Sequence, residues 1–212
     1  MIQTDATEQS LSGLSRIAAF LRQQDWQDGE RLGLTPTQMA ILHLIRRRGP
    51  LRIAALAAQV GATQATVSDA VTALVAKGAV ARLKDPADGR AVLATLTQAG
   101  ERTVDDLADR PNALDGILAS LDPRDRGDLN RVLVKLIHGL QEAGAIAPQR
   151  LCVTCRFFRP HHHDDAAKPH HCDFVNAAFG EPQLRLDCGD HEAADPDQAR
   201  RTARRFDTGP PA

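Results

Sequence analysis

The stretch that decides the fold is residues 63–97, TQATVSDAVTALVAKGAVARLKDPADGRAVLATLT. It begins with Thr63, a residue type that caps helices, and continues with aliphatic residues at helical spacing up to Gly78. Two aliphatic runs, 80–84 and 91–96, then flank a turn made of Pro, Asp and Gly. The stretch therefore predicts a helix followed by a β-hairpin.

The residues before this stretch predict further helices. A short helix, 53–59, stops at Gly61, and two helices joined by a tight turn containing glycine are typical of a helix-turn-helix. A hairpin beside the second helix is a wing. Upstream, Thr35 followed by Pro36 predicts a helix start. The earliest helix is amphipathic, with an apolar stripe of Leu11, Leu14, Ile17, Ala18 and Leu21.

The second helix of the pair and the wing carry the candidate DNA contacts. Its core-facing residues are predicted to be Val67, Val71, Leu74 and Val75. Small hydroxyl and amide groups on its other face can approach phosphates and base edges, and cations on the wing can approach phosphates. The predicted DNA-binding residues are Thr63, Gln64, Thr66, Ser68, Arg82, Lys84 and Arg90.

Charge and composition favour a duplex DNA partner and exclude other classes. Residues 35–97 hold eight Lys and Arg against three Asp and Glu, although the whole chain has a net charge of -1. Aromatic residues make up 3% of the 212 and Tyr is absent, which argues against base stacking on single strands. No apolar run is long enough for a membrane span, and no signal peptide precedes the first helix, so we expect a cytoplasmic protein without a membrane partner. No catalytic motif occurs, so we expect no enzyme.

Four segments together resemble the MarR family of winged-helix transcription regulators: LTPTQ at 34–38, TVS at 66–68, LVAKG at 74–78 and DGRAVLATLT at 88–97. The resemblance covers roughly residues 8–143. It departs from the family at Asp69, where a basic residue is common, and this puts the DNA-site preference in question.

The resemblance implies a homodimer that binds a pseudo-palindromic DNA site. In each protomer, the second helix of the helix-turn-helix would lie in a major groove, and Arg90 would reach an adjacent minor groove. The resemblance also favours a repressor over an activator. The family places its dimerisation elements at the two ends of the domain. The last helix of this segment carries a wide apolar stripe suited to a partner subunit: Leu129, Val132, Leu133, Leu136, Ile137 and Leu140.

The C-terminal part has a different composition. All four cysteines and six of the eight histidines fall between 152 and 191, in the pattern Cys152-x2-Cys155-x16-Cys172-x15-Cys188-x2-His191. Two close pairs of this kind predict a zinc site, for which five candidate ligands compete for four places. The order of the cysteines also resembles the cluster-binding run of high-potential iron proteins, so a [4Fe-4S] cluster is the alternative cofactor.

These patterns predict a mainly α protein with a small two-stranded β wing and a small irregular C-terminal module that is stabilised by a bound metal. We expect a winged-helix DNA-binding and dimerisation domain at 1–147, a Cys/His metal-binding module at 148–192 and a flexible tail at 193–212. The predicted function is that of a DNA-binding transcriptional regulator with a structural or sensory metal module, responding to a small-molecule or redox effector. The alternatives are a metal-dependent enzyme that uses the C-terminal His, Asp and Cys residues, or a regulator whose cysteine module docks a protein partner.

Overall fold

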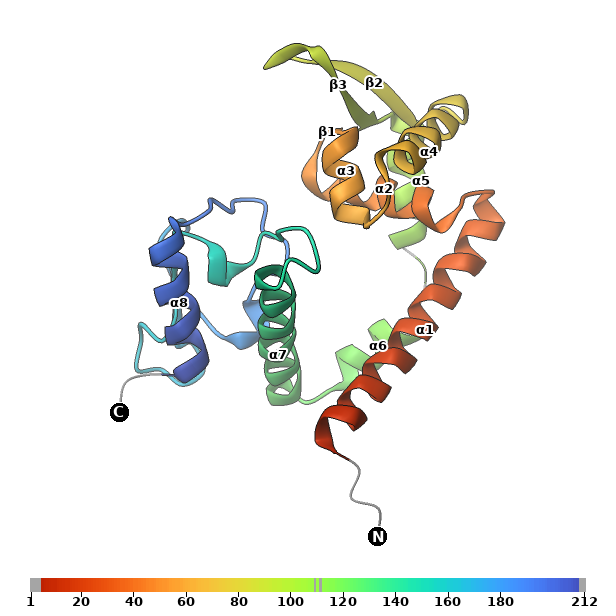
Figure 1. The fold of residues 1–212 in the computed structure, drawn as a ribbon. Coiled ribbons are helices and arrows are strands. Elements are labelled where there is room, and N and C mark those ends of the chain that lie inside the picture. The colour runs from red at the N-terminus through yellow and green to blue at the C-terminus, as the bar shows by residue number, and fades with distance from the viewer. Residues whose placement is uncertain (1–4, 109, 111, 210–212) are drawn as a thin grey trace. The chain divides into compact units, whose positions relative to one another are not determined.

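The computed structural model describes residues 5–108, 110 and 112–209 (Figure 1). The chain divides into two compact units, Met1–Arg110 and Pro111–Ala212. None of the helices in the described residues is both long enough and apolar enough to cross a membrane.

The first unit is a winged helix. Its elements in chain order are α1 (Ala6–Leu32), α2 (Pro36–Arg48), β1 (Leu51–Arg52), α3 (Ile53–Val60), α4 (Gln64–Ala76), β2 (Val80–Asp85), β3 (Asp88–Leu96) and α5 (Gln98–Ala108). The three strands form an antiparallel sheet in the order β1-β3-β2. The expected hairpin is thus confirmed, and β1 adds a third strand that the sequence analysis did not predict.

Local sequence signals set the helix ends. The Thr35 hydroxyl accepts a hydrogen bond from the Gln38 N–H, and the Gln38 side chain accepts one from the Thr35 N–H, which completes a capping box for α2. Thr63 caps α4 by accepting from the Thr66 N–H. Gly61 ends α3 in the left-handed conformation with φ 67°, which allows the tight turn between α3 and α4.

The core of the first unit lies between α2, α3, α4 and the sheet. Val67, Val71 and Leu74 on α4 are completely buried in it, as the helical spacing predicted. Gly100 on α5 lies so close to the chain before β2 that a Cβ atom there would be 2.0 Å from the carbonyl oxygen of Ala79. The core therefore fixes the face that α4 turns away from the interior.

The second unit combines helices with a small sheet. Its elements are α6 (Ala113–Ser120), α7 (Pro123–Glu142), the 3-10 helix η1 (Cys152–Thr154), β4 (Phe158–Arg159), β5 (His170–Cys172), β6 (Ala177–Phe179), the 3-10 helix η2 (Glu181–Gln183) and α8 (Pro196–Thr208). The strands are antiparallel in the order β4-β5-β6.

Helix α7 and the cysteine module share one core. Val134 of α7 is completely buried in a cluster with Val153, Phe158 and Phe206. The Asn130 side-chain amide also donates to the backbone oxygens of Glu181, at 2.9 Å, and Leu184, at 3.0 Å.

Two features of the second unit differ from the expected domain limits. The compact units divide after residue 110, whereas the sequence analysis set the division at 147 and grouped α7 with the winged helix. Residues 193–212 were expected to be a flexible tail, but 196–208 form α8, which buries Thr202, Ala203 and Phe206. Packing around Val134 and Phe206 accounts for both differences.

Candidate nucleic-acid interface

The N-terminal part of α4 presents a small polar surface. Thr63, Gln64 and Thr66 are exposed, and Ser68 is half-buried. The hydroxyls of Thr63 and Thr66 lie 2.8 Å apart and hydrogen-bond to each other. Asp69, next along the helix, is also exposed. The four predicted α4 contacts therefore come from the first two turns of a capped helix, where backbone N–H groups favour an anion.

The wing is a hairpin of β2 and β3 that is held against α4. The Arg82 guanidinium donates to the Thr72 hydroxyl on α4 at 2.7 Å. The strands pair in register from Val80 opposite Leu96 to Lys84 opposite Val92, and the register shifts between Lys84 and Asp85. Such irregularities bend a hairpin and re-aim its tip. Arg82 and Lys84 are both exposed on β2.

A buried carboxylate organises the tip of the wing. Asp85 accepts from the Arg52 guanidinium through Nε, at 2.7 Å, and through Nη2, at 2.6 Å, and it accepts from the Ala87 N–H at 2.8 Å. The hydrogen bond from Ala87 and then the one from Arg52 lower the pKa of Asp85. Asp85 is thus ionised at neutral pH, and it ties the turn of the wing to the β1 strand.

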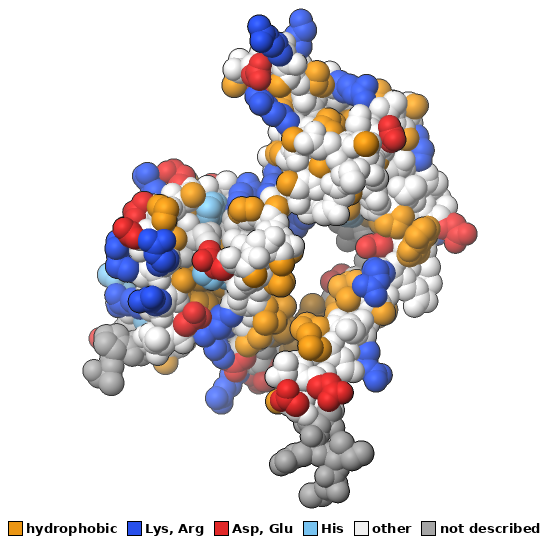
Figure 2. All heavy atoms as spheres, viewed as in Figure 1, with side chains coloured by type: hydrophobic (Ala, Val, Ile, Leu, Met, Phe, Trp, Pro, Cys, Tyr) orange, Lys and Arg blue, Asp and Glu red, His pale blue; other side chains and the backbone are white. Residues whose placement is uncertain are grey.

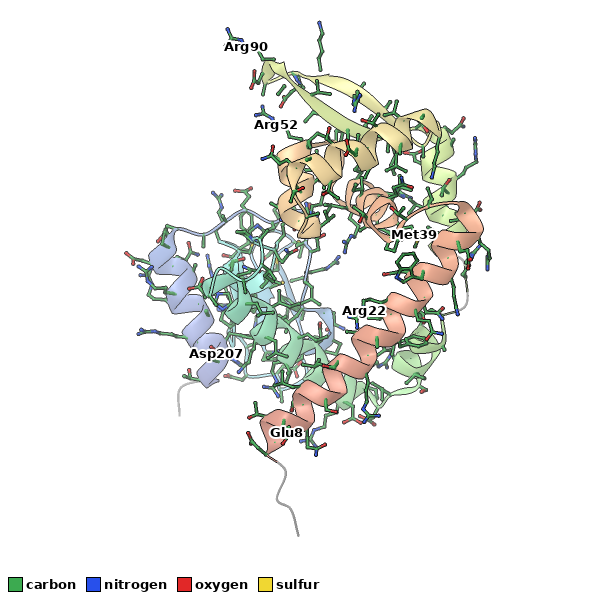
Figure 3. The ribbon with its side chains drawn as sticks, turned by 45° about the vertical axis from the view of Figure 1, so that its right-hand side comes forward. Glu8, Arg22, Met39, Arg52, Arg90 and Asp207 are labelled. Atoms are coloured by element: carbon green, nitrogen blue, oxygen red, sulfur yellow. The ribbon has the colours of Figure 1, made fainter. Side chains whose placement is uncertain are left out.

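Arg90 lies at the tip of the hairpin and extends away from the rest of the first unit (Figure 3). Its backbone N–H donates to the Asp88 carboxylate at 3.2 Å. The other oxygen of that carboxylate lies 3.6 Å from Arg52 Nη2. Among the described residues the Arg90 side chain itself has no hydrogen bond or ion pair. Arg52 is therefore neutralised by two carboxylates, and Arg90 keeps its charge available for a partner.

The structure brings the seven predicted DNA contacts onto two adjacent elements, α4 and the wing. In the space-filling view, Lys and Arg side chains gather on the projecting hairpin (Figure 2). Sequence reasoning missed Arg52 and Asp85, which hold the tip. They are 33 positions apart in the sequence, so no local pattern identifies such a pair.

The predicted metal ligands lie in the second unit. Cys152, Cys155, Cys172 and Cys188 line one cavity of about 170 Å³. Burial, together with the charge of the other three sulfurs, raises the pKa of the Cys152 thiol to about 12 against the hydrogen bond from the Arg185 N–H. His191, the fifth candidate, is not among the residues that line this cavity, and its Nε2 lies 3.0 Å from the Thr154 hydroxyl.

Comparisons with known proteins agree with this geometry. Residues 34–92, from the start of α2 into β3, match the model of the MarR family. Two curated relatives from Bacillus subtilis (strain 168) are described as uncharacterized HTH-type transcriptional regulators. YkoM is 30% identical over 79 residues, which are 37% of this chain and 51% of YkoM. YsmB is 26% identical over 129 residues, which are 60% of this chain and 88% of YsmB.

A solved structure shows the same fold. The structure of a MarR family protein from Bacillus stearothermophilus aligns with a TM-score of 0.55 and 26% identity, covering 66% of this chain and 99% of that one. The chain thus spans about half the length of YkoM and nearly all of the solved protein. The two curated relatives are both named as transcriptional regulators. The winged helix, with the wing that carries Arg90, thus matches over residues 34–92 the MarR family of winged helix-turn-helix transcriptional regulators.

Proposed function

We propose that the protein binds a pseudo-palindromic site in double-stranded DNA as a homodimer and represses transcription from that site. Helix α4 enters the major groove with its polar first turns, and the wing places Arg90 against the adjacent minor groove. The observation that carries this proposal is the exposed Arg90 side chain at the tip of a hairpin that Arg82 fastens to α4.

The charges of the wing suit contact with phosphates. Arg82, Lys84 and Arg90 are all exposed on one hairpin. Of its two acidic residues, Asp85 is buried and paired with Arg52, and the exposed Asp88 lies 3.6 Å from the same guanidinium. Each cation that neutralises a phosphate releases a counterion, so this surface favours binding at low salt. The hydroxyl and amide groups of α4 then supply contacts to base edges.

Exposed apolar stripes on two helices support the homodimer. Along the 27 residues of α1, Gly29 is the one described residue that is buried, while Leu11, Leu14, Ile17 and Leu21 are between 40% and 61% exposed. On α7, Leu129, Val132, Leu136 and Leu140 are between 40% and 46% exposed. Burying one such side chain contributes about 1.5–3 kcal/mol. A second copy of the chain that covers both stripes would account for them.

Selection from a random pool of DNA duplexes tests the DNA proposal. We expect enrichment of an inverted repeat whose half-sites lie about 10 base pairs apart, centre to centre. A reporter promoter that overlaps the selected site should lose expression when the protein is supplied. Failure to enrich any sequence at low salt would contradict the proposal, and increased reporter expression would contradict repression.

Light scattering after gel filtration tests the dimer. We expect twice the 22.9 kDa mass of the chain. Ile17→Glu places a charge in the α1 stripe and should shift the protein towards the monomer. Ser15→Glu adds the same charge to an exposed α1 position outside the stripe and should leave the mass unchanged. A wild-type monomer at micromolar concentration, or equal effects of the two substitutions, would contradict the proposed interface.

We also propose that the second unit is a metal-binding module. The support is that four cysteines from three separate segments line one cavity. Zinc was the cofactor expected from their spacing, with a [4Fe-4S] cluster as the alternative. Metal held in this cavity would stabilise a unit whose own apolar core is small.

A further inference from the structure

The cysteine cavity is assembled from three separated segments. Cys152 and Cys155 lie at the two ends of the η1 turn, where the Cys155 N–H donates to the Cys152 oxygen at 2.9 Å. Cys172 ends β5, directly opposite Phe158 in the sheet. The Cys188 N–H donates to the Arg150 oxygen at 3.0 Å, which holds its loop beside the start of η1. Backbone hydrogen bonds thus fix the positions of all the cysteine-bearing segments.

The size of the cavity distinguishes between a single ion and a larger group. Its volume is about 170 Å³. A water molecule needs roughly 10–15 Å³ measured in this way, and a cavity of about 150 Å³ takes up benzene. A single metal ion would leave most of this cavity unfilled. The cavity therefore has room for a group of many atoms.

The positions of the ligands lead to the same distinction. A zinc ion requires four ligands around one point, with Zn–S distances of about 2.3 Å, so that the sulfurs lie about 3.8 Å apart. No set of three or more Cys, His, Asp or Glu residues in the described parts of the chain converges in a way that could hold one ion. In a four-iron cluster each cysteine binds a different iron atom, so the sulfurs surround the group instead of converging on a point.

The wall of the cavity has the chemistry of a cluster site. Phe157, Phe158, Phe174 and Phe179 line it and make much of its wall apolar. Arg185 also lines the cavity, and its backbone N–H donates to Cys152 Sγ at 3.2 Å. Hydrogen bonds to sulfur and shielding from solvent are the means by which proteins tune iron–sulfur clusters.

We propose that this cavity holds one [4Fe-4S] cluster, with each of the four cysteines bound to one iron. His191 is not a ligand, because it lies outside the wall and is within hydrogen-bonding distance of the Thr154 hydroxyl. The assignment concerns the second unit alone and does not depend on the proposed DNA binding.

Metal and sulfide analysis of the full chain tests the proposal. The protein is produced in iron-rich medium and purified without air, and iron, zinc and acid-labile sulfide are measured per protomer. We expect about four irons and four sulfides, with a brown colour. One zinc without sulfide, two irons with two sulfides, or a protein free of metal would each overturn the four-iron assignment. DNA binding of the same sample is measured separately, so that failure of one proposal is distinguishable from failure of the other.

A matched pair of variants tests the ligand set. Cys172→Ala should lose most of the iron and sulfide, whereas His191→Gln should keep the wild-type content of both. Loss of metal from His191→Gln comparable to that from Cys172→Ala would indicate a site of three thiolates and one imidazole, and would overturn the proposal. If Cys172→Ala does not fold, the wild-type analysis and the His191→Gln measurement still decide the outcome.

Discussion

Replacing Arg90 by alanine should weaken DNA binding by an amount that depends on salt. Its side chain has no intramolecular partner among the described residues, so its removal breaks no bond that holds the wing. Each phosphate contact contributes about 0.9 to the slope of log K against log salt. The three hairpin cations of each protomer, Arg82, Lys84 and Arg90, give a dimer a slope of about 5.4, and loss of both Arg90 side chains lowers this to about 3.6.

Fluorescence anisotropy of a labelled duplex at several salt concentrations measures this slope. Between 50 and 200 mM salt, the ratio of the wild-type to the Arg90→Ala dissociation constant should change about 12-fold. Arg22→Ala removes an exposed charge from α1 and serves as the control with the same change in net charge (Figure 3). An unchanged slope for Arg90→Ala, or an equal decrease for Arg22→Ala, would refute the reasoning that the wing tip contacts phosphate.

Three further predictions concern the stability of the first unit. Gly100→Ala should lower the free energy of unfolding by about 1–3 kcal/mol in urea denaturation, because the new Cβ meets the Ala79 oxygen. The control is Gly13→Ala on α1, where the new Cβ meets no atom, and this substitution should raise the free energy of unfolding by up to about 1 kcal/mol. The pKa of Asp85 is lowered on folding, so its ionised form stabilises the wing above pH 3.8 and this contribution disappears as the pH falls further. Asp85→Asn should therefore be less stable than wild type at neutral pH, and the difference should shrink as the pH falls below 3.8; a constant difference would contradict this. Burial lowers the pKa of His43 from 6.5, so the unfolded chain binds more protons below that pH. Wild type should thus lose more stability than His43→Gln between pH 7 and pH 5, and parallel curves would argue against it.

Much of the winged helix was predictable because its signals are local. Thr35 and Thr63 mark helix starts, and the spacing of Val67, Val71 and Leu74 marks the buried face of α4. The β1 strand has only two residues, and it exists because Leu51 pairs with Ala94, far away in the sequence. Pairing of this kind is set by tertiary structure, and no short pattern predicts it.

The sequence at the end of the chain did contain a signal for helix α8. Asp195 followed by Pro196 is a typical helix start, and Thr202, Ala203 and Phe206 recur on one helical face. Charged residues around them gave α8 the composition of a solvated tail. For the candidate sites, the exposed residues of α4 and the wing could be chosen from the sequence, while the Arg52–Asp85 pair depends on the fold. The volume enclosed by the cysteines likewise exists only once η1, β5 and the Cys188 loop are packed together.

The burial of Val134 among the residues around the cysteines has a practical consequence for dissecting this protein. A fragment cut at residue 147, where composition changes, would strip α7 of the side chains that cover Val134 and would tend to aggregate or be degraded. Cutting after Arg110 keeps each hydrophobic core whole. Helix α7 and the cysteines thus form one folding unit, and a gene fusion that transfers one without the other should yield little usable protein.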